Sequence, residues 1–150
     1  SIHSMTIPFN SAQFIVIRLG QEQYGIDISY IENIVRMQHI TRVPKLAPYL
    51  KGVINLRGEV IPIMCLSMKM GLPVEEETKE SRIIIIKMEQ CGTLGLIVDE
   101  VKEVVTLDMT EQVEKLAFKK EDKSNFVQGV GKCAGGLISL LDLNAVTAEK

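Results

Sequence analysis

An internal repeat is the feature that most constrains how this 150-residue chain can fold. Residues 52–66 read GVINLRGEVIPIMCL, and 77 positions later residues 129–143 read GVGKCAGGLISLLDL. A second match, offset by 70 positions, aligns FIVIRLGQEQYGIDI from Phe14 with IIIKMEQCGTLGLIV from Ile84. The chain therefore holds two copies of one unit. Differences between the copies help to separate residues that the backbone requires from residues that function requires.

Short runs of β-branched residues bounded by turn residues dominate both copies, which predicts strands rather than long helices. Residues 83–86 are apolar throughout, as in a strand buried on both faces. The expected strands are residues 14–19, 24–28, 52–56, 59–64, 83–88 and 94–98.

Two short helices are also expected. One covers residues 66–70 and is ended by Gly71, and the other follows Asp142, which is a suitable N-cap. The segment at 111–123 is charged and mixed, and it is compatible with either a solvated loop or a surface helix.

The group Ile31, Glu32, Asn33 and Ile34 has apolar residues at the spacing of one helical turn, which would open a further strand. Asp27 or Ser29, and Asp99 in the second copy, are candidate caps of that turn. Ile31 and Ile34 recur as Val101 and Val104, so we expect them in the core, with Glu32 and Asn33 facing outward.

Each copy is close to the size at which a hydrophobic core of its own is marginal. We therefore expect a mainly all-β fold of two small five-stranded barrels that pack together. The first repeat spans about 13–74, the second about 82–143, and a C-terminal helix covers about 143–149. Residues 1–12 form a tail whose first four residues resemble an expression remnant, and 75–80 form a polar joint.

Composition excludes several classes of function. The net charge is −2, with 17 basic and 19 acidic residues well mixed, which argues against nucleic acid binding. No apolar run reaches the ~18 residues of a membrane span, and no signal peptide is visible. Cys65, Cys91 and Cys133 form no CxxC pair, so a disulfide framework, a zinc site and a cofactor are not expected. No catalytic motif is visible, and reduced thiols favour the cytoplasm.

Arg57 is the strongest candidate for a functional residue, because a turn at Arg57-Gly58 would present its forked donors to solvent. The repeat places Ala134 at the equivalent position, so the turn itself does not require arginine. Gly58 matches Gly135 and is explained by backbone geometry.

Residues 49–66, YLKGVINLRGEVIPIMCL, resemble the signature of a known family. The family is that of the chemotaxis coupling protein CheW, which includes the regulatory domain of the chemotaxis histidine kinase CheA. The resemblance covers nearly the whole chain, and the NLRG segment, which contains Asn55, is its most specific part.

The resemblance implies two SH3-like barrels and a non-enzymatic adaptor that is a monomer alone. The implied partners are the regulatory domain of the kinase and the cytoplasmic signalling tip of chemoreceptors, which recruit the adaptor to receptor arrays. The implied contact residues are Arg57 and Asn55, the flanking Gly52 and Gly58, and the group Ile31, Glu32 and Asn33. Here Asn33 occupies the position of the family's glutamate, and Glu32 stands one place earlier.

Two alternatives remain open from the sequence. The chain could be a CheW-like module from a larger chemotaxis protein. A barrel that binds a small ligand, from a different functional class, would need converging polar groups in a pocket.

Overall fold

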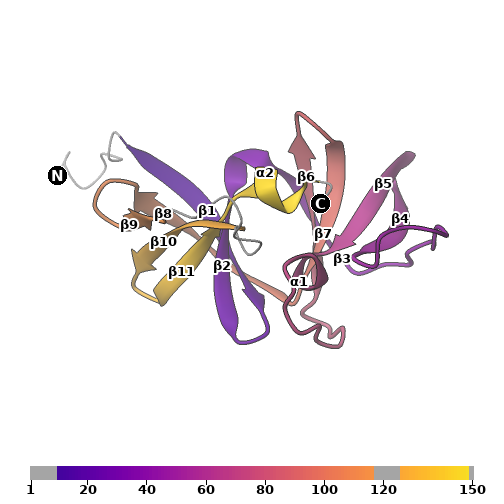
Figure 1. The fold of residues 1–150 in the computed structure, drawn as a ribbon, viewed down its shortest axis with the longest axis horizontal. Helices are drawn as coiled ribbons and strands as arrows, with labels where there is room; N and C mark the ends of the chain where they lie inside the picture. Colours follow the sequence, from indigo (N-terminus) through magenta and orange to yellow (C-terminus); the bar gives the residue numbers. More distant parts are fainter. Residues whose placement is uncertain (1–9, 117–125, 149–150) are drawn as a thin grey trace.

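The computed structural model describes residues 10–116 and 126–148, and it shows two β-sheets packed against each other (Figure 1). The strand order of the first sheet is β8-β1-β2-β11-β10-β9 and that of the second is β3-β6-β7-β5-β4. The first sheet comprises β1 (Ser11–Leu19), β2 (Glu22–Asp27), β8 (Glu100–Asp108), β9 (Val113–Lys115), β10 (Val127–Cys133) and β11 (Gly136–Leu141). The second comprises β3 (Ile31–Arg36), β4 (Leu50–Leu56), β5 (Glu59–Cys65), β6 (Arg82–Met88) and β7 (Gly92–Val98).

Each sheet is built from both repeats. The first sheet joins β1 and β2 of the first copy to β8, β10 and β11 of the second, and the second sheet joins β3, β4 and β5 to β6 and β7. The strand orders β8-β1-β2-β11-β10 and β3-β6-β7-β5-β4 correspond strand for strand. The two repeats are therefore interlocked, and neither sheet is the product of one repeat alone.

The mainly β fold of two packed SH3-like barrels is confirmed. In the first sheet β10 contacts β8, so the sheet curls toward closure, and it gains one short additional strand, β9. The segment that contains β9 was expected to be a loop or a helix, and this expectation is wrong for Val113–Lys115. Residues 117–125 of that segment lie outside the described part of the chain.

Gly25 and Gly95 occupy equivalent places in the two sheets. A Cβ atom at Gly25 would lie 2.9 Å from Leu140, and one at Gly95 would lie 2.6 Å from Ile63. Leu140 and Ile63 are themselves matched by the repeat. Glycine at these positions lets the apolar side chain of the neighbouring strand cross the backbone closely.

The match between β1 and β6 is shifted by one residue from the sequence alignment. Gly25 pairs with Val16, and Gly95 pairs with Ile85, so the first strands correspond with an offset of 69 and not 70. The cause is turn length, since the β6–β7 turn (89–91) is one residue longer than the β1–β2 turn (20–21). One residue of slip exchanges the two faces of a strand, so the correct register decides which side chains enter which core.

The apolar side chains form three clusters: a large one shared by the sheets and a smaller one inside each barrel. Alternate residues of β6 point to different clusters, with Ile84 and Ile86 in the shared core and Ile83 and Ile85 inside the second barrel. This explains why 83–86 is apolar throughout, as the sequence predicted.

The prediction of a helical turn from Ile31 to Ile34 is wrong, because these residues belong to strand β3. One turn of 3₁₀-helix lies just before it, at Ile28–Tyr30, and Asp27 caps this turn by accepting a hydrogen bond from the Ser29 amide at 2.9 Å. Ile31 begins β3, where a β-bulge between Ile31 and Asn33 interrupts the strand alternation. The bulge places apolar residues at a spacing that imitates a helix.

Asp99 does not cap a helix in the second copy. Its carboxylate accepts a hydrogen bond from the Gly20 amide at 2.7 Å, which ties the start of β8 to the β1–β2 turn. The short helices α1 (Leu66–Lys69) and α2 (Leu143–Val146) end one and three residues, respectively, before their expected limits of 70 and 149. Asp142 caps α2 as predicted, by accepting from the amides of Asn144 and Ala145.

Within residues 10–116 and 126–148, no helix is long and apolar enough to cross a membrane.

Candidate functional site

Arg57 lies at the tip of the β4–β5 hairpin with a left-handed backbone. The φ angles of Arg57 and Gly58 are 53° and 86°, which is the type I′ geometry that suits the twist of a two-residue hairpin. The side-chain oxygen of Asn55 accepts a hydrogen bond from the Gly58 amide at 3.1 Å and so closes the turn. Arg57 is exposed, and no ion pair within the described residues involves it.

The turn of the second copy has a different geometry. Between β10 and β11 the positive φ falls on Gly136, at 112°, and neither Ala134 nor Gly135 has one. Ala134 does stand at the turn position equivalent to Arg57, because Cys133 pairs with Gly136 as Leu56 pairs with Glu59, but its backbone does not adopt the left-handed conformation of Arg57. An L-residue in the left-handed region costs roughly 1–2 kcal/mol, and such strain is concentrated at functional sites.

A surface groove of about 360 Å³ lies beside this tip, between β3 and the β4–β5 hairpin. Its floor is apolar, with the buried Ile61 and Ile85, and its rim carries charged and polar side chains. The lining residues are Glu32, Asn33, Leu56, Arg57, Glu59, Ile61 and Ile85. We call these seven residues the Arg57 groove.

The β-bulge of β3 brings Glu32 to the groove. Glu32 is the extra residue of the bulge, because Ile31 pairs with Ile86 and Asn33 pairs with Ile85. Asn33 is half-buried, and its side-chain oxygen accepts a hydrogen bond from the Ile34 amide at 2.8 Å. The glutamate that stands one place early in the sequence is thereby exposed on the rim near Arg57.

The second copy keeps the bulge and changes its charge. Val16 pairs with Glu103 and Ile17 with Val101, so Lys102 is the extra residue there. The bulge therefore does not require glutamate. In this barrel Leu107 packs on Gly131, where a Cβ would lie 2.6 Å from the leucine, and β8 and β10 approach each other.

The structure assembles only part of the residue set that the sequence suggested. Arg57, Glu32 and Asn33 meet in the groove, while Asn55 and Gly58 shape the turn. Gly52 and Ile31 do not line it.

Gly52 and Ile31 are explained by packing. Gly52 is buried with φ of 138°, and a Cβ there would overlap the carbonyl oxygen of Thr41, which bridges to Val53. Ile31 is half-buried against the shared core.

Sequence reasoning missed the groove's acidic rim residue Glu59 and its apolar floor. The alternation of β5 indicates that Ile61 faces inward, but only the folded structure shows that it shares an apolar cluster with Ile85, since β7 separates β5 from β6 in the sheet.

The groove offers binding and not an evident reaction. No cluster of histidine, cysteine, aspartate or glutamate able to hold a metal ion occurs within the described residues. Cys65 is buried, Cys91 is exposed and Cys133 is half-buried, and all three are free thiols. A cationic tip, two carboxylates and an apolar floor can recognise a protein surface that has complementary charge around an apolar side chain.

Two interlocked SH3-like barrels with an exposed, strained hairpin tip define a protein-interaction module. The chain belongs to the CheW-like domain family, whose family model matches residues 13–150. This confirms the resemblance found from the NLRG segment.

Several relatives of this chain are named chemotaxis proteins. It is 35% identical to "Chemotaxis protein CheW" of Bacillus subtilis, over 89% of this chain and 85% of that one. It is 32% identical to the protein of the same name from Thermotoga maritima, over 87% and 84% of the two chains. The crystal structure of the scaffolding protein TtCheW from Thermoanaerobacter tengcongensis aligns with a TM-score of 0.82 and 31% identity, covering 92% of this chain and 94% of that one.

Proposed function

We propose that this protein is a non-enzymatic adaptor that couples chemoreceptors to a chemotaxis histidine kinase within a signalling array. The relatives that match almost the whole chain carry the name of a chemotaxis protein, and a structural neighbour is described as a scaffolding protein. The observation that carries the proposal is Arg57, an exposed cation held in a strained turn beside Glu32. A turn optimised for stability alone would have asparagine or glycine at that position.

The Arg57 groove is proposed as the contact for one of the two macromolecular partners, the kinase regulatory domain or the receptor signalling tip. Arg57 can donate two parallel hydrogen bonds to a partner carboxylate or to backbone carbonyls. Glu32 on β3 and Glu59 on the same hairpin as Arg57 can accept hydrogen bonds from partner cations. The apolar floor between these charges suits one inserted aliphatic side chain.

A second contact is proposed on the outer faces of the barrels. Val60 of β5 and Leu137 of β11 are 62% and 64% exposed, and the repeat matches them to each other. Each is the second residue of the strand that follows its hairpin turn. Large apolar side chains at equivalent exposed places can serve pairing with a related barrel, such as the regulatory domain of the kinase. Such an interface can be modest, at or below about 1,600 Å² in total.

The adaptor acts in the cytoplasm in this proposal and reaches the membrane through its partners. It needs no cofactor, since binding alone couples the receptor to the kinase.

The test is a binding measurement on both partners, with the purified regulatory domain and a receptor tip fragment. Arg57→Ala should weaken binding to one of them by about tenfold or more, as a charge-assisted contact to a desolvated partner is worth roughly 1.5–3 kcal/mol. Arg57→Lys should recover part of the loss because an ammonium cannot form the bidentate fork. Lys115→Ala, which removes an exposed cation from β9 of the other barrel, is the matched control.

Unchanged affinity of Arg57→Ala for both partners would remove the groove from the proposal. Failure of the wild-type chain to bind either partner would overturn the adaptor function itself.

A further inference from the structure

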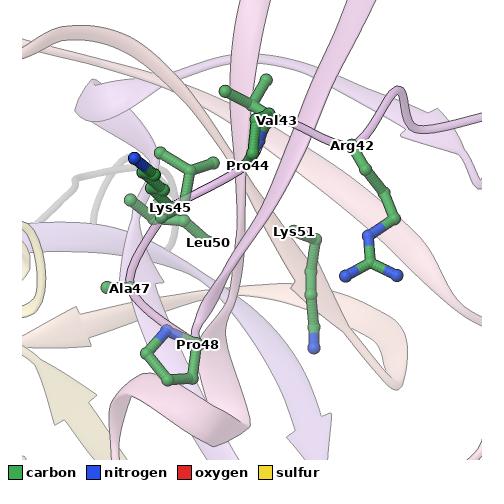
Figure 2. Close-up of a pocket in the computed structure, with 9 residues that line it drawn as sticks. Arg42, Val43, Pro44, Lys45, Ala47, Pro48, Leu50 and Lys51 are labelled. Atoms are coloured by element: carbon green, nitrogen blue, oxygen red, sulfur yellow. The ribbon is translucent and has the colours of Figure 1, made fainter.

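A second pocket lies away from the Arg57 groove and shares no residue with it. It has a volume of about 550 Å³ and is formed by the loop that joins β3 to β4 (Figure 2). The lining residues are Arg42, Val43, Pro44, Lys45, Leu46, Ala47, Pro48, Leu50 and Lys51. We call this set the 42–51 pocket. Three of its residues are cations, none is acidic, and the other six are apolar.

Within the described residues, the cations of the pocket form no ion pair, although Lys51 also lines a smaller pocket together with Glu75 and Glu77. Arg18–Glu100 is the ion pair found within the described residues, and it lies on the first sheet. Lys51 points its ammonium at the sulfur of Met68, 4.0 Å away, which is a weak acceptor. On a chain whose net charge is −2, these three cations gather at a pocket with no carboxylate among its lining residues, which makes the potential there more positive.

Lys45 stands in an unfavourable backbone conformation at this pocket. Its φ is 64°, in the left-handed region, where a glycine or an asparagine would be less costly. Arg57 is the other non-glycine residue with a positive φ angle in the described part of the chain. A strained cation thus marks both the Arg57 groove and the 42–51 pocket.

The loop holds its shape before any ligand arrives. Pro44 and Pro48 restrict its backbone, and Thr41 exchanges two backbone hydrogen bonds with Val53, of 2.8 and 2.9 Å. The Cys65 amide donates to the Tyr49 carbonyl at 2.7 Å. A loop fixed in this way loses little entropy when a ligand binds.

The arrangement of the cations favours a peptide over a small anion. Figure 2 shows the side chains of Arg42 and Lys51 extending in the same direction, while Lys45 lies on the far side of the loop. The charges are spread across the pocket and do not converge on one point, as a phosphate cradle would require. Between them Val43 and Leu46 remain 40% and 39% exposed, which suits apolar side chains of a ligand.

We propose that the 42–51 pocket is a second docking site, which binds an extended peptide segment of a partner protein whose acidic side chains alternate with apolar ones. In an extended strand successive side chains point to opposite sides, and those on one side repeat every second residue. The acidic side chains can then meet the cations of one wall while the apolar ones cover Val43 and Leu46. This contact is additional to the Arg57 groove and does not depend on it.

The experiment measures binding of a short dye-labelled peptide in which glutamate alternates with leucine, by fluorescence anisotropy on the full chain. The double variant R42E/K51E should weaken binding by about tenfold or more, since each lost charge-assisted contact is worth roughly that factor. Leu46→Ser should weaken it less, and Lys45→Asn should weaken it while keeping the left-handed turn. Lys132→Glu, a reversal of an exposed cation on the other barrel, should leave the affinity unchanged.

Further measurements identify which kind of ligand binds in the 42–51 pocket. A peptide in which lysine replaces glutamate should not bind, and rising salt should weaken the glutamate peptide, because exposed charges are screened. The proposal would be overturned by no binding to the wild-type chain, by equal binding to R42E/K51E, or by competition from inorganic phosphate as effective as that from unlabelled peptide. Self-association of the chain that R42E/K51E abolishes would assign the pocket to the exposed acidic segment 75–80 of a second copy and would also overturn it.

Discussion

Arg57 and Lys45 share a left-handed backbone conformation, with φ angles of 53° and 64°, and no other residue except glycine does so in the described part of the chain. Both side chains are cationic and exposed, and they stand at two separate concave surfaces of the second barrel. Each therefore holds a positive charge in a conformation that lowers the stability of the free protein. This is the pattern expected where binding and not folding has determined the residue.

The first prediction concerns Arg57→Asn. This change creates the Asn-Gly pair that type I′ turns favour, so the free energy of unfolding should rise by about 0.5–1 kcal/mol. Affinity for the partner at the Arg57 groove should fall in the same variant, because the amide carries no charge. Urea denaturation and partner binding on one preparation measure both effects. A loss of stability would show that the arginine side chain supports the fold.

The second prediction separates two glycines that flank the hairpin. Gly52→Ala should lower the free energy of unfolding by about 3 kcal/mol or more, because the new methyl would overlap the Thr41 carbonyl in a strained backbone. Gly58→Ala is the matched control. Its φ is also positive, at 86°, but nothing lies within 4 Å of the added methyl, so a loss of only about 1 kcal/mol is expected. Equal losses would mean that the Thr41–Val53 bridge moves without cost.

The third prediction concerns acid stability. Glu100 accepts a hydrogen bond of 2.9 Å from Arg18, and this bond lowers the pKa of the Glu100 carboxyl below its ordinary value of 4.5. A depressed folded pKa means that the contribution to stability is complete above the unfolded pKa and is lost as the pH falls through the folded one. The pair is one-third exposed, so the contribution stays under about 1 kcal/mol.

Glu100→Gln should therefore lower stability slightly at neutral pH and not at pH values below the carboxyl titration. Urea midpoints of both proteins across that range measure the difference, which salt should reduce. A difference that is constant with pH would show that the effect of Glu100 is not electrostatic.

Local patterns in the sequence were sufficient to predict the elements near the candidate site. The run 83–86 predicts a strand buried on both faces, and the Arg57-Gly58 pair predicts a tight hairpin turn, because both signals depend on neighbours in the chain. The prediction of a helical turn from Ile31 to Ile34 failed because it also rested on neighbours in the chain alone. A bulge cannot be recognised without the partner strand β6, and its side chains imitated a helix.

The pairing of strands that are distant in the sequence could not be predicted from the sequence alone. The repeat shows that β1 and β6 are equivalent, but not that β1 pairs with β8 and β3 with β6. A repeat is equally compatible with two barrels that each close on their own strands. The Arg57 groove depends on this choice, since its floor residue Ile85 belongs to the second repeat and the hairpin tip to the first.

The last prediction tests the interlocked arrangement with two separate half-chains, 1–74 and 75–150. In the intact protein, β1 of the first half pairs with β8 of the second, and β3 pairs with β6. The shared core also draws side chains from both halves. Each half alone would lose these partners at a size where a single core is already marginal. Neither half should show cooperative urea unfolding by itself.

Mixing the two halves should restore a sigmoidal transition and dispersed amide NMR signals, because each half carries the strands that the other lacks. The transition should shift to higher urea as the protein concentration rises, as it does when folding and association are coupled. As a control, two copies of the same half mixed together should show no such gain. A half that unfolds cooperatively as a monomer would mean that β3 can return to pair with β1, its neighbour within the repeat. In that case each barrel can close in two ways, either with strands of both repeats or with strands of one repeat alone. The Arg57 groove forms only in the first of these arrangements, because its floor residue Ile85 belongs to the second repeat.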